Sequence, residues 1–195
     1  MMIERISFKI VNWLLKNGAI SENDTRFYQY AAFNIIYAST PLISILVIGS
    51  CLHVFGESIL FGITFLCLRK YTGGFHFNSL MLCIPFSLTI EGLFLILAAS
   101  KASIILIWFS YPLAVLSLIL FSPVMSSKRF LTTEERKHCK LVVIKQLVII
   151  SIICYAFDWM KSSDWTAFPK SATIMVGISQ YPALLIDTIR RKRNK

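Results

Sequence analysis

The strongest constraint on the fold is a series of long apolar runs. They occupy 32–50, 52–68, 80–98, 103–122, 141–157 and 171–189. A helix needs about 20 apolar residues, within a range near 17–25, to cross the hydrocarbon core of a bilayer. We therefore expect an all-α integral membrane protein, with one membrane domain over 1–195 and a bundle of about six transmembrane helices. The run 52–68 is the weakest, because it contains His53 and Glu57, and it either spans or re-enters the membrane.

The composition supports a membrane protein. Hydrophobic residues make up 56% of the 195 residues and charged residues 15%, against about 25% charged residues in ordinary soluble domains. A soluble core of this size could not bury so much apolar surface. The net charge of +10 comes from basic residues that lie between the apolar runs. They are better suited to setting topology and contacting anionic lipid than to binding nucleic acid, so we expect no nucleic-acid partner.

The basic segments also predict the orientation. Lys and Arg are concentrated in 69–79, in 123–140 and in the tail 190–195. Cytoplasmic loops carry an excess of these residues, which places all three segments inside the cell. The segment 158–170, in which acidic residues offset the lysines, then lies outside. With the bundle over 31–189, we expect the C-terminal tail in the cytoplasm, and the N-terminus there as well if 52–68 spans the membrane.

The N-terminal region, 1–30, begins with an amphipathic pattern. Apolar residues recur at helical spacing, and polar residues take the other face. The apolar set is Ile3, Ile6, Ile10, Trp13 and Leu14. Such a helix lies on a membrane surface. It is either a plain membrane anchor or a docking surface for a substrate that is itself bound to the membrane. Asn17-Gly18 is expected to end it, and Ser21 to cap the next helix.

The segment after the second run contains a candidate nucleophile and base. His76 and Cys83 are separated by about 10.5 Å along a straight helix, which is too far for a hydrogen bond. Gly73-Gly74 permits a break that would let His76 fold back toward Cys83. A thiolate is a good nucleophile, and an imidazole can accept its proton. Arg69 could hold a substrate carboxylate or a developing oxyanion.

The same spacing has a plainer interpretation. Segment 69–79 could be a polar turn between two spans, in which Arg69 and Lys70 set topology and Cys83 only packs. The other ionisable groups in the runs are expected to pair inside the bundle, and Glu91 could join the site or pair with Lys145. The five cysteines show no C-x-x-C spacing, so we expect no disulfide framework, no metal and no cofactor.

Two motifs resemble the accessory gene regulator protein B (AgrB) family, which are membrane cysteine endopeptidases of Gram-positive bacteria. The first is 69–76, Arg-Lys-Tyr-Thr-Gly-Gly-Phe-His, followed by Cys83. The second is Ser-Pro-Val at 122–124, which leads to Lys-Arg-Phe-Leu at 128–131 and to Glu134. The length, the span pattern and the basic C-terminus are similar to the family as well.

The resemblance implies a function in quorum sensing at the cell membrane. Such proteins process an AgrD-like precursor peptide. Cys83 would be the nucleophile and His76 its base, and the acyl-enzyme thioester would allow the peptide to close a thiolactone or lactone. Arg69, Gly73 and Gly74 match the family's Arg and Gly-rich turn. Lys128 and Arg129 match a basic cluster that could hold the acidic tail of the precursor.

Two other classes of membrane protein are alternatives. One is a small non-enzymatic membrane transport or structural subunit, in which His76 and Cys83 do no chemistry. The other is a membrane enzyme of different chemistry, although the chain contains no H-E-x-x-H, G-x-S-x-G or Walker pattern. Besides membrane lipids and the precursor peptide, we expect a second copy of the chain as a partner, because small bundles with interior polar groups often form homodimers.

Overall fold

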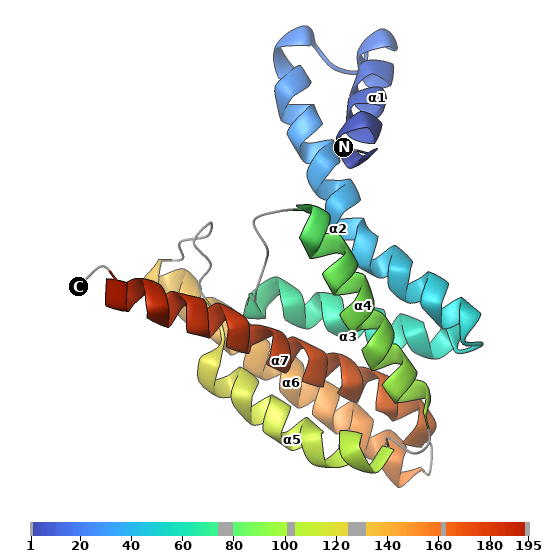
Figure 1. The fold of residues 1–195 in the computed structure, drawn as a ribbon, viewed down its shortest axis with the longest axis vertical. Coiled ribbons are helices and arrows are strands. Elements are labelled where there is room, and N and C mark those ends of the chain that lie inside the picture. Colours follow the sequence, from blue (N-terminus) through green and yellow to red (C-terminus); the bar gives the residue numbers. More distant parts are fainter. Residues whose placement is uncertain (1, 74–79, 101–103, 125–131, 161–162, 194–195) are drawn as a thin grey trace. The chain divides into compact units, whose positions relative to one another are not determined.

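The computed structural model describes residues 2–73, 80–100, 104–124, 132–160 and 163–193. Within these ranges every regular element is a helix, as the sequence predicts (Figure 1). The elements are α1 (Met2–Lys16), the 3-10 helix η1 (Glu22–Asp24), α2 (Thr25–Cys51), α3 (Phe55–Thr72), α4 (Leu80–Ala99), α5 (Ile104–Phe121), α6 (Thr133–Trp159) and α7 (Ser163–Arg193). The chain divides into two compact units, Met1–Ser44 and Ile45–Lys195.

Four helical stretches are long and apolar enough to cross a membrane. They are Glu22–Cys51, Leu82–Ala99, Ile104–Phe121 and Thr133–Trp159. This confirms the all-α membrane bundle. The two remaining runs, 52–68 and 171–189, also form helices, α3 and α7, but among the described residues neither meets the same test of length and composition. Both carry polar residues that pack inside the second unit, which lowers their apolar content.

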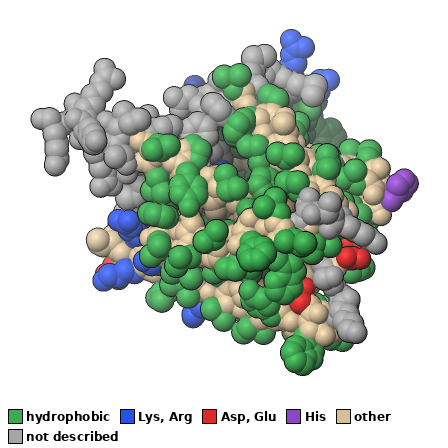
Figure 2. Space-filling model, turned by 60° about the horizontal axis from the view of Figure 1, so that its bottom comes forward, with side chains coloured by type: hydrophobic (Ala, Val, Ile, Leu, Met, Phe, Trp, Pro, Cys, Tyr) green, Lys and Arg blue, Asp and Glu red, His purple; other side chains and the backbone are tan. Residues whose placement is uncertain are grey.

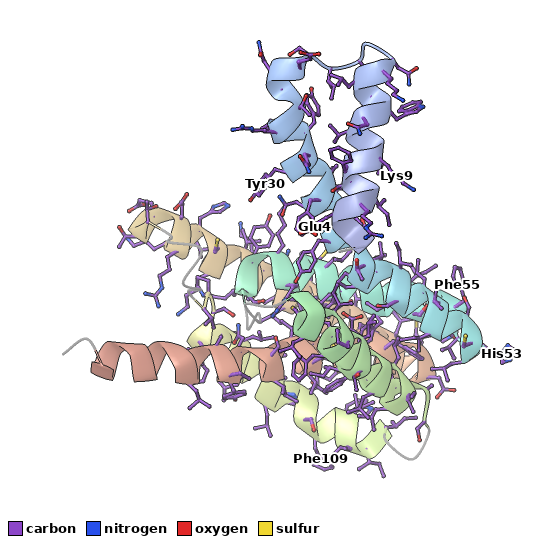
Figure 3. The ribbon with its side chains drawn as sticks, turned by 45° about the horizontal axis from the view of Figure 1, so that its top comes forward. Glu4, Lys9, Tyr30, His53, Phe55 and Phe109 are labelled. Atoms are coloured by element: carbon purple, nitrogen blue, oxygen red, sulfur yellow. The ribbon has the colours of Figure 1, made fainter. Side chains whose placement is uncertain are left out.

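The surface has the character expected of a protein in lipid. Hydrophobic side chains cover much of the face shown in Figure 2. On α5, Ile105, Phe109 and Leu113 are exposed, and Figure 3 shows Phe109 pointing away from the neighbouring helices. Apolar side chains at such positions would be costly in water but are favourable in a hydrocarbon solvent.

The apolar runs underestimate the length of several helices. Arg69 and Lys70 belong to the last turn of α3 rather than to a loop. The expected loops 123–140 and 158–170 are shortened, because α6 begins at Thr133 and α7 at Ser163. At the start of α6, Thr132 and Glu135 form a capping box, in which each side chain bonds the other residue's backbone N–H. Polar residues continue a helix beyond its membrane part without breaking it, so a hydropathy pattern does not mark its ends.

The first unit contains α1 and the beginning of α2. Helix α1 ends at Lys16, and Gly18 follows with a φ of +67°, as Asn17-Gly18 predicts. Ile6, Ile10 and Trp13 are exposed, which leaves an apolar stripe on α1, while Lys9 points outward in Figure 3. Ser21 does not cap a helix with its side chain. Its hydroxyl instead donates to Asp24 Oδ2 at 2.8 Å.

In the second unit, α7 packs against α3, α4, α5 and α6. Its approach to α5 is close, because a Cβ added to Gly177 would lie 3.4 Å from Ala114 Cβ. Ser171 donates a hydrogen bond to the Phe94 carbonyl of α4 at 2.9 Å. The buried hydrophobic core includes Phe61, Leu68, Tyr111, Leu118, Leu147 and Val176. A helix surrounded in this way can carry polar groups, since its partners are other helices rather than lipid.

The run 52–68 starts with a tight turn instead of a helix. Helix α2 ends at Cys51 and α3 begins at Phe55, and His53 between them has a φ of +59°. Figure 3 shows His53 at this turn, pointing outward. A Cβ added to Gly49 would come within 2.2 Å of Ser58 Oγ. Gly49 therefore lets the two helices approach closely on either side of the turn.

A buried ion pair joins α6 to α7. Lys170 donates to Asp158 Oδ2, Thr166 donates to the other carboxylate oxygen, and the Lys170 and Asp158 side chains are only 1% and 7% exposed. Lys170 Nζ also lies 3.9 Å from the centroid of the Trp108 ring on α5. The sequence placed these charges in an outer loop. They are instead structural partners inside the bundle.

Candidate functional site

The last turn of α3 is held by an arginine. Arg69 Nη1 donates to the Gly73 carbonyl at 2.9 Å and to Ser179 Oγ on α7 at 2.9 Å. The carbonyls at the end of a helix lack partners within the helix and carry a partial negative charge, so a cation is favourable there. One guanidinium nitrogen thus ties the residue that ends α3 to a helix more than a hundred residues later in the chain.

Gly73 occupies a conformation that other residues avoid. Its φ is 71° and its ψ is −158°, a region that is essentially restricted to glycine. A Cβ at this position would lie 2.5 Å from the Val124 carbonyl oxygen. The glycine is therefore required twice, once by its own backbone and once by the segment packed against it. This confirms a glycine-dependent break after α3.

The second motif contacts the first at this point. The Val124 N–H donates to the Thr72 carbonyl at 2.9 Å, so the segment after α5 is bonded to the end of α3. Ser122, Pro123 and Val124 are all buried, and the Ser122–Pro123 peptide bond is cis. Two motifs that are about 50 residues apart in the sequence therefore form one local structure.

Two neighbouring residues of α7 complete this cluster. Ser179 accepts the hydrogen bond from Arg69, and Gln180 Nε2 donates to Ser122 Oγ at 2.6 Å. Gln180 is 0% exposed, and its Oε1 has no hydrogen-bond partner among the described residues. Neither Ser179 nor Gln180 was predicted from the sequence. A glutamine inside an apolar run was the available signal, because polar side chains in membrane helices usually have an interior partner.

Cys83 lies in the first turn of α4, which begins at Leu80. It is buried, with 5% of its surface exposed. Pro85 follows inside the same helix. Cys83 is therefore a buried thiol in the first turn of a helix.

Several of the predicted site residues fall in parts of the chain that the structure does not describe. They are Gly74, His76, Lys128 and Arg129. Arg69 with Gly73, and Cys83, stand at the two described ends of the segment 74–79. The pairing of His76 with Cys83 and the role of Lys128 and Arg129 remain predictions.

The other candidates from the sequence are dispersed. Glu91 is buried on α4, whereas Lys145 is exposed on α6. Cys139 is buried in α6, next to an exposed His138. In the described part of the chain, no group of three or more His, Cys, Asp and Glu residues is arranged to hold a metal ion.

Known proteins show which family the chain is similar to. The sequence model of accessory gene regulator B (AgrB) matches residues 7–184, which is most of the chain. The chain belongs to the AgrB family. An AgrB-like protein 2 of Clostridium perfringens (strain 13 / Type A) is 25% identical over 194 residues, covering 91% of this chain and 88% of the relative. An AgrB-like protein of Clostridium perfringens (strain SM101 / Type A) is 25% identical over 217 residues, covering 100% of this chain and 99% of the relative. No solved structure matches the chain.

Membership in the AgrB family confirms the resemblance drawn from the two motifs. It places the protein in the agr quorum-sensing system, where the family acts with the AgrD precursor. The apolar helices fit a protein of the cell membrane.

Proposed function

We propose that this AgrB protein is a membrane cysteine endopeptidase that cleaves the C-terminal tail from its AgrD-like precursor. The observation that carries the proposal is the arrangement at the end of α3. Arg69, Gly73 and Val124 join the two family motifs in one structure, and the buried thiol of Cys83 starts the next helix. A non-enzymatic subunit would have no need for both features on either side of His76.

The proposed reaction has two transfers. The Cys83 thiolate attacks the carbonyl before the tail, His76 delivers a proton to the departing amine, and the peptide bond is replaced by a thioester. His76 then accepts the proton of a thiol or hydroxyl of the bound peptide, whose sulfur or oxygen attacks the thioester. This forms a thiolactone or lactone and releases the Cys83 thiolate. Hydrolysis would waste the thioester, so burial of Cys83 supports the scheme by limiting access of water.

The remaining residues have supporting roles in this proposal. Arg69 would stabilise negative charge near the reacting carbonyl, and Gly73 with Gly74 would let the chain turn toward Cys83. Lys128 and Arg129 follow the segment that is bonded to Thr72, which would bring two cations near the site for an acidic tail. With the basic segments inside the cell, this site and both termini face the cytoplasm.

The deciding experiment is co-expression with the cognate precursor. We expect Cys83→Ala to abolish cleavage while the protein still accumulates in the membrane, and His76→Ala to do nearly the same. Cys139→Ala is a matched control, because Cys139 is also a buried thiol near the start of a helix, and it should leave cleavage intact. Mass spectrometry should detect a peptide thioester on Cys83 in the native protein. Unchanged cleavage by the Cys83→Ala variant would refute the proposal.

A further inference from the structure

We infer that Ser179 and Gln180 on α7 are positioning residues for the active site. The inference rests on the proposed function and extends it to a helix that neither motif contains. Ser179 would fix the Arg69 side chain, and Gln180 would fix the segment that bonds to the end of α3. Neither residue needs to touch the substrate.

The Ser179 hydroxyl has a fixed direction. It donates its own hydrogen to the Val176 carbonyl at 2.8 Å, so it is left to accept from Arg69 Nη1 at 2.9 Å. The direction of the hydroxyl is thus set by α7 itself. An arginine side chain has high conformational entropy, and a fixed acceptor on a packed helix restricts it.

Arg69 links Ser179 to the end of α3. The same nitrogen that binds Ser179 donates to the Gly73 carbonyl. Gly73 is the last described residue before the segment that contains His76. The direction in which the chain leaves α3 is therefore set by a bridge that runs from α7 through Arg69 to Gly73.

Gln180 holds a different element from Ser179. Adjacent residues of a helix project about 100° apart, so Ser179 and Gln180 can hold two different elements. Gln180 bonds Ser122, and the Val124 N–H two residues later bonds the Thr72 carbonyl. Gln180 and Ser122 are both buried, where hydrogen bonds are stronger than in water. One turn of α7 thus secures both sides of the contact between the motifs.

Loss of the Ser179 hydroxyl should affect the reaction more than precursor binding. Small misplacements of a catalytic group cost up to about 100-fold in rate. We expect Ser179→Ala to lower kcat for precursor cleavage by about 10- to 100-fold, with KM changed by less than about twofold. Ser179→Thr keeps a hydroxyl at this position and should restore most of the rate.

Ser171→Ala is the matched control. Ser171 lies on the same helix, is buried, and donates one hydrogen bond, to the Phe94 carbonyl of α4. Its removal costs a similar contact but leaves Arg69 in place. In protein reconstituted into nanodiscs, Ser171→Ala should cleave the precursor at close to the native rate. A Ser179→Ala variant that behaves like Ser171→Ala would overturn the inference.

A second measurement does not depend on cysteine chemistry. The Val124 amide is protected by the Thr72 carbonyl, so its hydrogen exchange reports on the contact between the motifs. Ser179→Ala and Gln180→Met should speed this exchange by at least about tenfold, whereas Ser171→Ala should not. Unchanged exchange in both variants would refute the anchoring, and faster exchange with a native kcat would refute the positioning role. If Cys83→Ala cleaved the precursor, the proposed function would fail while the exchange result still decided the anchoring.

Discussion

The buried pair of Asp158 and Lys170 gives a prediction whose magnitude follows from its surroundings. Breaking a buried ion pair by removing one partner costs about 3–5 kcal/mol, because the other charge is left buried without a counter-charge. We expect Lys170→Met to lie at the upper end of this range. It removes the ion pair and also the contact with the Trp108 ring at 3.9 Å, and a desolvated cation–π contact is worth about 2 kcal/mol.

Asp158→Asn should cost less, near the lower end of the same range. The asparagine can still accept the hydrogen bond from Thr166, and Lys170 keeps its place over Trp108. The double variant Asp158→Leu with Lys170→Met leaves no unpaired charge. Replacing both members of a buried pair with apolar residues is often neutral, so the double change should cost less than either single change.

The free energy of unfolding can be measured by SDS titration of the protein in mixed micelles, with helix content as the signal. The unfolding free energy of each of the three variants is compared with that of the native protein. Single changes that each cost less than about 1 kcal/mol would refute the reasoning, since that is the value of a solvent-exposed pair. Lys170 precedes Ser179 by nine residues, or about 13.5 Å along a helix. The cleavage rate per folded molecule should therefore be unchanged, which separates this pair from the positioning residues.

Two further predictions concern the motifs. Gly73→Ala should destabilise the end of α3 by about 1–3 kcal/mol and reduce precursor cleavage, because its Cβ would meet the Val124 carbonyl oxygen at 2.5 Å. Gly56→Ala is the control in the same cleavage and SDS assays, because the atom nearest to its Cβ would be 3.5 Å away. Reversing the charge at Lys128 and Arg129 should weaken binding of the precursor, measured in nanodiscs, by more than it slows cleavage of bound precursor, and equal affinity would remove these residues from substrate binding.

Much of the fold could be predicted from the sequence, because lipid imposes a strong pattern. The length of an apolar run is dictated by bilayer thickness, so the helices themselves were predicted correctly. Their ends were not, because polar residues such as those of the Thr132 capping box extend α6 beyond its apolar part. Lys170 was assigned to an outer loop for the same reason. A hydropathy scale assigns lysine to a position in contact with water, whereas the partners of Lys170 are Asp158 and the Trp108 ring.

The candidate site could be predicted only where its signal is local. The Gly73 turn is encoded by two adjacent glycines, and Cys83 stood out within the same segment. Ser179 and Gln180 could not be predicted in this way, because their partners are 110 and 58 residues away in the sequence. A hydroxyl or an amide in an apolar run shows that some partner exists, but only the packing of α7 shows which one.

The position of α7 explains why it does not meet the test of length and composition for a membrane span among the described residues. From Thr166 to Gly177 every residue is buried except Pro169, which is half-buried. The reason is that α3, α4, α5 and α6 pack around α7. Apolar surface is required where a helix meets lipid, and the neighbours of α7 supply that surface in its place. The helix is therefore free to carry the polar residues that hold the protein together, Lys170 toward α6 and Ser179 toward α3. In this family member, α7 is the least apolar of the long helices and is the one against which α3, α4, α5 and α6 pack.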